Sequence, residues 1–251
     1  MNTLLRLLVL LCGSAAAGWA MAADIKLLTA GAYKPVVEAI KADFERQTGH
    51  RLLVQNDTAG ALQRRITGGE PFDLVVATPS VLAQLMQAGK LAGAMPQLAR
   101  VAIGVAVKTG APAPDITTVA SFKATLLAAR KVATIDPAAG GSSGIYLWQL
   151  FEKQGIAEQL KPKAVLVPGG LVAERVVSGE ADVAIHQISE ILAVPGATLV
   201  GPIPAEIQNY TVYAGGVSAA AGDAAAARAL LDALQSPAAR AVLASKGMES
   251  P

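Results

Sequence analysis

The chain has 251 residues, of which 53% are hydrophobic and 16% charged, and its formal net charge is +2. A disordered chain is excluded, because this share of apolar residues is enough to form a buried core. Nucleic acid is disfavoured as a partner, since phosphate neutralisation needs clustered Lys and Arg and the sequence has no basic run.

The first 22 residues have the pattern of a secretory signal peptide. Arg6 lies in a short basic start, an apolar stretch covers residues 7–17, and small residues precede an expected cleavage site near Ala22. The apolar stretch is too short for a membrane-spanning helix. Cleavage removes Cys12, the only cysteine, which excludes disulfides and thiol chemistry from the mature chain. We therefore expect a periplasmic protein.

Short apolar runs then alternate with segments of helical periodicity. Strands are expected at 25–29, 52–55 and 72–77, and helices at 34–47, 61–67 and 81–88. Such alternation predicts an α/β fold, with a mostly parallel sheet flanked by crossover helices. A strand-like run at 101–107 ends this series.

A second series follows a loop at 110–114. Helices are expected at 122–129, 145–153 and 171–178, strands at 131–135, 164–167, 183–187 and 212–217, and two final helices at 224–234 and 238–246. If strands 101–107 and 212–217 are crossings, residues 23–107 and 212–251 form one lobe and residues 108–211 form a second, inserted lobe. Two crossings make a hinge, and a hinge predicts a cleft between the lobes.

The loops after the strands are the candidate binding site. In open parallel sheets, ligands bind at the carboxyl ends of the strands, where helix N-termini present free N–H groups. These loops are rich in Gly, Ser and Thr, which suits a small anion or polar solute, although such residues are also common as caps and turns. The candidate ligand-binding residues are Gly31, Ala32, Tyr33, Asp57, Thr58, Ala59, Thr78, Ser142, Ser143, Gly170, Leu171, His186 and Gln187. No metal or cofactor is expected.

Several segments carry a resemblance to a known family: residues 27–44, 58–66, 72–77, 144–146, 179–185 and 236–240. They resemble the substrate-binding proteins of ABC importers, and most closely the molybdate-binding family with its type II periplasmic-binding fold. The resemblance implies a monomer of two lobes with the cleft between them. It also implies an ABC permease and its ATPase as partners.

In that family the resemblance implies an oxyanion held by hydroxyls, backbone N–H groups and a tyrosine. Here Gly31 stands where a serine is usual, Ala59 lacks a hydroxyl, Gln187 replaces the tyrosine, and Thr58 keeps one hydroxyl. Asp57 adds a carboxylate, which at about 4 Å and an effective dielectric near 20 repels an anion by roughly 4 kcal/mol. We therefore expect an organic carboxylate or other polar solute rather than molybdate or tungstate.

Other interpretations stay open. A sensor that presents its closed form to a membrane receptor would have the same fold. Residues 140–144 match G-x-S-x-G, so Ser142 with Asp182 and His186 is considered as a serine esterase, but residues 136–141 separate the serine from its strand. We expect binding without catalysis. If His186 contacts an anion, the affinity for that anion should rise as pH falls through the pKa of the histidine. Tyr33 is a separate question, since it either lines the cleft or packs on the sheet.

Overall fold

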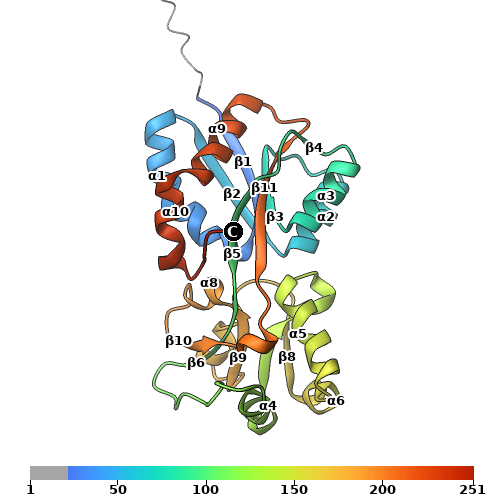
Figure 1. Cartoon of the computed structure of the whole chain (residues 1–251). Coiled ribbons are helices and arrows are strands. Elements are labelled where there is room, and N and C mark those ends of the chain that lie inside the picture. Colours follow the sequence, from blue (N-terminus) through green and yellow to red (C-terminus); the bar gives the residue numbers. More distant parts are fainter. Residues whose placement is uncertain (1–21) are drawn as a thin grey trace, which may run out of the picture.

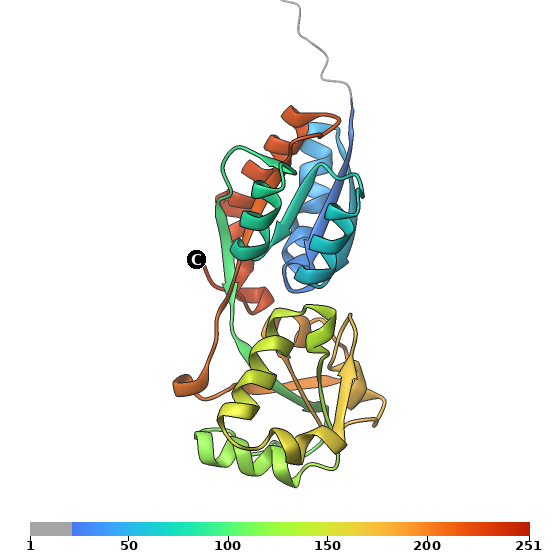
Figure 2. The same ribbon diagram turned by 90° about the vertical axis from the view of Figure 1, so that its right-hand side faces the viewer.

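The structure, a computed structural model, describes residues 22–251. Two β-sheets, each covered by helices on both faces, lie one above the other (Figures 1 and 2). This arrangement confirms the expected α/β fold with two lobes. Apart from Ala22, the expected signal peptide at 1–22 lies outside the described residues. Within 22–251, no helix combines the length and the apolar character needed to cross a membrane.

The first lobe is built on a sheet with the order β2-β1-β3-β11-β4, and β5 also pairs with β11. Its strands are β1 (Asp24–Ala30), β2 (Arg51–Asp57), β3 (Leu74–Ala77), β4 (Leu91–Ala92), β5 (Gln97–Val101) and β11 (Thr211–Ser218). β1 runs parallel to β2 and β3, whereas β11 is antiparallel to β3. Successive side chains of β1 point to opposite faces, so Leu27 and Leu28 lie in different cores.

Five helices cover this sheet. They are α1 (Lys34–Thr48), α2 (Ala59–Thr67), α3 (Pro79–Gln87), α9 (Ala224–Gln235) and α10 (Pro237–Leu243). The buried residues of α1, α9 and α10 pack on one face, and those of α2 and α3 pack on the other (Figure 1). With both faces covered, every residue of β3 is buried, as is usual for a central strand of this kind of sheet.

The second lobe has a sheet with the order β10-β6-β9-β7-β8. Its strands are β6 (Ile103–Lys108), β7 (Val132–Ile135), β8 (Ala164–Val167), β9 (Val183–Gln187) and β10 (Ala197–Pro202). Its helices are α4 (Val119–Ala128), α5 (Ser142–Lys153), α6 (Ala157–Leu160), α7 (Glu174–Val177) and α8 (Ile188–Ile191). α4, α5 and α6 pack on one face, and α7 and α8 pack on the other.

Two chain segments connect the lobes. β5 ends at Val101 in the first sheet and β6 begins at Ile103 in the second, and the chain returns between β10 and β11 (Figure 1). The side chain of Gln208 on the return segment bonds both backbone groups of Ile103: its Nε2 donates to the carbonyl and its Oε1 accepts from the N–H, each at 2.9 Å. One amide side chain therefore joins the two crossings.

The expected lobe boundary after residue 107 differs from this arrangement. Strand 103–108 pairs with β9 and β10 of the second sheet, and the crossing itself lies at Ala102. The apolar run 101–107 hides the break because residues on both sides of Ala102 are equally buried. The short edge strands β4 and β5 and the strand β10 were not expected either, and the helix expected at 171–178 is reduced to the short α7.

Candidate functional site

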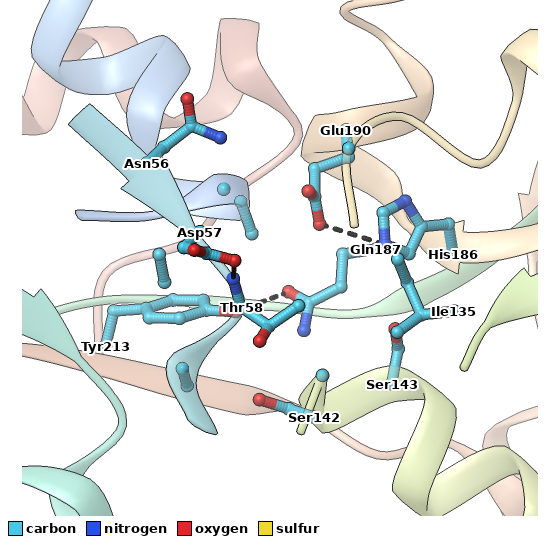
Figure 3. A pocket seen from close by; sticks show the side chains of 16 residues that line it. Asn56, Asp57, Thr58, Ile135, Ser142, Ser143, His186, Gln187, Glu190 and Tyr213 are labelled. Carbon is cyan, nitrogen blue, oxygen red and sulfur yellow. Dashed lines mark hydrogen bonds and ion pairs between the residues drawn. The ribbon is translucent and has the colours of Figure 1, made fainter. Parts of the chain in front are cut away.

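A small cavity lies between the two sheets, where β1, β2, β7 and β9 end (Figure 3). Its volume is about 30 Å³, against about 10–15 Å³ needed for one water molecule. Ten of the residues that the sequence nominates line it: Gly31, Ala32, Asp57, Thr58, Ala59, Ser142, Ser143, Gly170, His186 and Gln187. The two lobes therefore bring the strand-end loops together around one cavity.

Three nominated residues do not line this cavity. Tyr33 is fully buried in the core of the first lobe, which answers the open question in favour of packing on the sheet. Thr78 bonds Ser80 beside the start of α3. Leu171 lines an adjoining, more open pocket that shares Gly31 and Glu190 with the cavity.

The N-termini of helices point at the cavity from both lobes. α2 begins at Ala59 and α5 begins at Ser142, and a 3-10 turn at Gly31–Tyr33 leads into α1. Thr58 caps α2 by accepting the Ala61 N–H at 3.1 Å. Helix N-termini carry unpaired N–H groups and a partial positive charge, so both walls favour a negatively charged guest.

On one side of the cavity the two lobes touch through a group that we call the latch: Thr58 and Gly60 from the first lobe, Ala139 and Gly140 from the second. The Thr58 hydroxyl donates to the Ala139 carbonyl at 2.6 Å, and the Gly60 N–H donates to the Gly140 carbonyl at 3.0 Å. A Cβ on Gly60 would lie 2.8 Å from the Gly140 Cα, so this approach requires glycine. The structure is therefore a closed form.

The carboxylate of Asp57 is held by its own lobe. One oxygen accepts the Thr58 N–H at 2.8 Å, and the other lies 3.3 Å from the guanidinium of Arg65. Arg65 in turn contacts Glu70 at 2.6 Å, and together with Lys26 it lowers the pKa of Glu70 to about 2. The repulsion expected of Asp57 toward an anion is therefore reduced by a neighbouring cation.

Glu190 and His186 form a second contact region, which we call the acidic pair. Glu190 lies on α8 and His186 on β9, four residues apart, and Oε2 of the carboxyl is 3.2 Å from Nε2 of the imidazole (Figure 3). Burial raises the pKa of Glu190 to about 8 and lowers that of His186 to about 3. Both groups are therefore mainly neutral at pH 7, and the contact joins two neutral groups rather than an ion pair.

The neutral state of His186 changes one expectation. An affinity that rises as pH falls through the pKa of this histidine requires it to gain charge between pH 5 and 8, and burial prevents this. The imidazole is only 2% exposed, and its Nδ1 has no hydrogen-bond partner among the described residues.

The glycine at position 31 is explained by Glu190. A Cβ on Gly31 would lie only 2.5 Å from Oε1 of Glu190. The carboxyl thus occupies the space in which the serine usual in the molybdate-binding family would place its side chain. A side chain at position 31 would therefore require the carboxyl of Glu190 to move from its present place.

Gln187 is bonded to the return strand β11. Its Nε2 donates to Thr211 at 3.1 Å, and its Oε1 accepts the Tyr213 hydroxyl at 3.0 Å (Figure 3). Burial, with the nearby Glu190, raises the pKa of Tyr213, so the phenol stays protonated. Although Gln187 stands where a tyrosine was expected, another strand brings a tyrosine to the same cavity.

Sequence reasoning missed six lining residues: Ala30, Asn56, Ile135, Gly141, Glu190 and Tyr213. Ala30, Asn56 and Gly141 belong to the same strand-end loops as nominated residues, and Ile135 ends the strand before one of them. Glu190 has no helical spacing to signal it, because His186, four residues earlier, lies on a strand. Tyr213 has no local signal.

The esterase arrangement does not form. Asp182 lies at the opposite end of β9 from His186, and its carboxylate pairs with Arg130 and accepts the Arg130 N–H at 2.7 Å. His186 instead contacts Glu190. Ser142 therefore has no histidine oriented by Asp182, which a triad requires.

The model of a family described as bacterial extracellular solute-binding protein matches residues 25–249. Aconitate isomerase from a Pseudomonas species is 33% identical over 232 residues, which is 90% of this chain and 87% of that protein.

Two solved structures share the fold. The periplasmic molybdate-binding protein of Azotobacter vinelandii superimposes with a TM-score of 0.76 and 19% identity, over 90% of this chain and 99% of that chain. The sulfate-binding protein SubI of Mycobacterium tuberculosis has a TM-score of 0.73 and 20% identity, over 91% of this chain and 87% of that chain.

Proposed function

Because the chain belongs to the bacterial extracellular solute-binding protein family, we propose that it captures a small organic carboxylate in the cavity between its lobes and delivers it to an ABC permease and its ATPase. The observation that carries this proposal is the composition of the cavity walls. Helix N-termini enter from both lobes, and Glu190 adds a carboxyl that is protonated at neutral pH. The guest is therefore anionic, yet compatible with a carboxylic acid as its neighbour.

The choice of a carboxylate over an oxyanion rests on charge. Among the described residues that line the cavity there is no Lys or Arg, while Asp57 and Glu190 are both present. A doubly charged oxyanion would meet the Asp57 carboxylate without a matching cation inside the cavity. Each carboxylate group of an organic acid carries one charge shared by two oxygens, so a single group can meet the cavity wall, where it accepts both helix N–H groups and the O–H of a protonated Glu190.

The same helix N-termini explain how a ligand would close the two lobes. An anion that bridges α2 and α5 gains hydrogen bonds from both lobes only when the latch is formed. A ligand shifts the open and closed populations by what it gains in the closed form. The ligand therefore stabilises the shape that a permease would recognise.

The test is a thermal-shift and calorimetric screen of the purified chain. Citrate, malate, cis-aconitate and trans-aconitate are compared with molybdate, tungstate and sulfate. At 100 times its dissociation constant, a bound acid adds about 2.7 kcal/mol to the free energy of unfolding. Submicromolar binding of molybdate or tungstate, with no response to any carboxylic acid, would contradict the proposed ligand class.

A second candidate function, isomerisation of a small unsaturated acid in the same cavity, is favoured by one observation. Glu190 has a pKa raised into the range of acid–base catalysts, and it lines the cavity between the lobes. The relative that is 33% identical is named for such an activity, whereas the structural neighbours are binding proteins. Conversion of cis-aconitate to its trans isomer, followed by proton NMR, tests it directly.

A further inference from the structure

Building on the second candidate function, we propose that Glu190 is the catalytic residue that removes and returns the proton in a 1,3-hydrogen shift on a bound unsaturated carboxylic acid, and that His186 is its positioning residue. The substrate class is a small acid with a CH₂ group next to its carbon–carbon double bond. Three observations support this assignment: the free oxygen of Glu190, the orientation of its carboxyl and the strength of its carboxylate as a base.

The first observation shows which titratable side chain is free to exchange a proton with a bound molecule. The titratable side chains among the described cavity residues are Asp57, His186, Glu190 and Tyr213. Asp57 is paired with Arg65, and Tyr213 donates its hydroxyl to Gln187. Only the carboxyl of Glu190 combines a place in the cavity with an oxygen, Oε1, for which no hydrogen bond or ion pair is found among the described residues. Glu190 is therefore the group placed to exchange a proton with a guest.

The second concerns orientation. Oε2 of Glu190 is held 3.2 Å from Nε2 of His186, and Oε1 lies over Gly31, where a Cβ would be 2.5 Å away. The imidazole can accept the O–H of the acid form or donate to the carboxylate form, because a neutral histidine has one donor and one acceptor nitrogen. In either state the carboxyl keeps one edge against His186 and turns the other toward the first lobe.

The third concerns the strength of the base. A carbon-bound proton is weakly acidic, so a carboxylate with an ordinary pKa removes it slowly, and the burial that raises the pKa of Glu190 makes its carboxylate a stronger base.

The step itself balances without an external reagent. The carboxylate of Glu190 takes a proton from the CH₂ carbon, and the electron pair of that C–H bond forms a new double bond to the middle carbon. The electrons of the original double bond take up the proton from Glu190 at the far carbon. One C–H bond breaks, one forms, the double bond moves by one carbon, and its geometry is set anew without oxidation or reduction.

The charged and titratable groups around Glu190 bear on its pH dependence. His186 faces it from β9, Tyr213 from β11 and Asp57 from β2, while Lys34 and Glu38 of α1 share the adjoining pocket with it. His186 and Tyr213 stay neutral around pH 7. The midpoint of the activity profile therefore reports mainly on Glu190.

The test uses the whole described chain with trans-aconitate in D₂O, and proton NMR follows both the cis isomer and deuterium uptake. Binding is measured separately by calorimetry with propane-1,2,3-tricarboxylate, which has no double bond. We expect Glu190→Gln to bind this analogue within tenfold of wild type and to lose at least about 100-fold in isomerisation rate. Glu190→Asp, which keeps a carboxyl but withdraws it from Gly31, is expected to retain partial activity.

His186→Phe tests the positioning role. The phenyl ring fills a similar space but cannot donate to the carboxylate, so the midpoint of the kcat–pH profile is expected to move to higher pH while some turnover remains. An unchanged profile, or full isomerisation by Glu190→Gln, overturns the assignment. Binding by wild type without isomerisation or deuterium uptake overturns this inference and leaves the binding function standing, whereas no binding of any acid overturns both.

Discussion

The latch and the acidic pair lie on the same cavity, but they differ in chemistry. The latch joins the lobes through a hydroxyl and main-chain atoms, with donor–acceptor distances of 2.6 and 3.0 Å, and the exposed Arg64 guanidinium adds a longer bond of 3.2 Å to the Ala139 carbonyl. The acidic pair places two ionisable side chains 3.2 Å apart, with Glu190 only 8% and His186 only 2% exposed. The latch contacts have the same strength at every pH near neutrality, whereas the contact within the acidic pair changes with pH.

The difference assigns closure and proton chemistry to different residues. A neutral hydrogen bond contributes about 0.5–1.5 kcal/mol net, which suits contacts that form and break with each ligand. A buried ionisable pair instead lowers stability at any pH where one member must be charged. The four predictions below separate the two regions.

The largest expected effect is on the stability of the acidic pair. The folded-state pKa of Glu190, about 8, lies above its ordinary value of 4.5. Its favourable contribution is therefore complete below pH 4.5 and is lost as pH rises through 8. Glu190→Gln removes this loss, and at about 1.36 kcal/mol per pH unit the variant should exceed wild type in free energy of unfolding by up to roughly 5 kcal/mol above pH 8.

Urea unfolding across this range measures the difference between the two proteins. The two curves should converge toward pH 4.5. The lowered pKa of His186 makes its contribution complete above pH 6.5 and progressively lost as pH falls from there toward 3, but both proteins carry this histidine, so its effect cancels in their difference. Equal stability of variant and wild type above pH 8 would show that Glu190 ionises freely in the folded state.

The next effect is on the latch. In Gly60→Ala the new Cβ would meet the Gly140 Cα at 2.8 Å, and since both partners are backbone atoms, the lobes cannot close fully. Ligand affinity should fall by about 100-fold, or about 2.7 kcal/mol, while the unliganded chain keeps its melting temperature because alanine is favoured in a helix. Gly169→Ala is the matched control, since a Cβ there meets nothing within 4 Å. Calorimetry showing equal losses for both variants would contradict the role of the latch.

Substitution of Thr58 removes one hydrogen bond of the latch without blocking the approach of the lobes. Its hydroxyl oxygen accepts the Ala61 N–H and donates to Ala139 across the cleft. Thr58→Ala should lose about 1 kcal/mol of stability from the missing cap and, from the lost bond between lobes, about fivefold in affinity. Thr58→Ser retains the hydroxyl and should lose little of either. A cap effect without any change in affinity would mean that the bond to Ala139 does not contribute to closure.

The same contrast explains what the sequence could predict. Latch residues such as Thr58 follow a strand directly, and cavity residues such as Ser142 lie at the end of a loop that follows one, so periodicity and loop chemistry place them at the cleft. The resemblance to ABC substrate-binding proteins is confirmed by the family match and the structural neighbours. Local pattern and family likeness were therefore sufficient for the fold and for the donor-rich part of the cavity.

The acidic pair could not be found in this way. Glu190 matters because it lies over Gly31, which is distant in sequence and in the other lobe, and no local pattern reports that approach. Tyr213 reaches Gln187 only because the chain returns to the first sheet through β11. The break at Ala102 was hidden by a continuous apolar run. In each case the missing information is how distant segments meet, which depends on the packing of the two lobes.

The smallest expected effect separates charge from hydrogen bonding within the latch. Arg64 donates to the same Ala139 carbonyl as Thr58, at 3.2 Å, but this bond is exposed to solvent. Water competes for an exposed donor, so Arg64→Ala should change affinity less than twofold, within about 0.5 kcal/mol. Calorimetry at low and high salt checks this, with Thr58→Ala as the comparison. A loss of tenfold or more that disappears at high salt would show that the latch depends on the charge of Arg64, and the division between an uncharged latch and an ionisable pair would then fail.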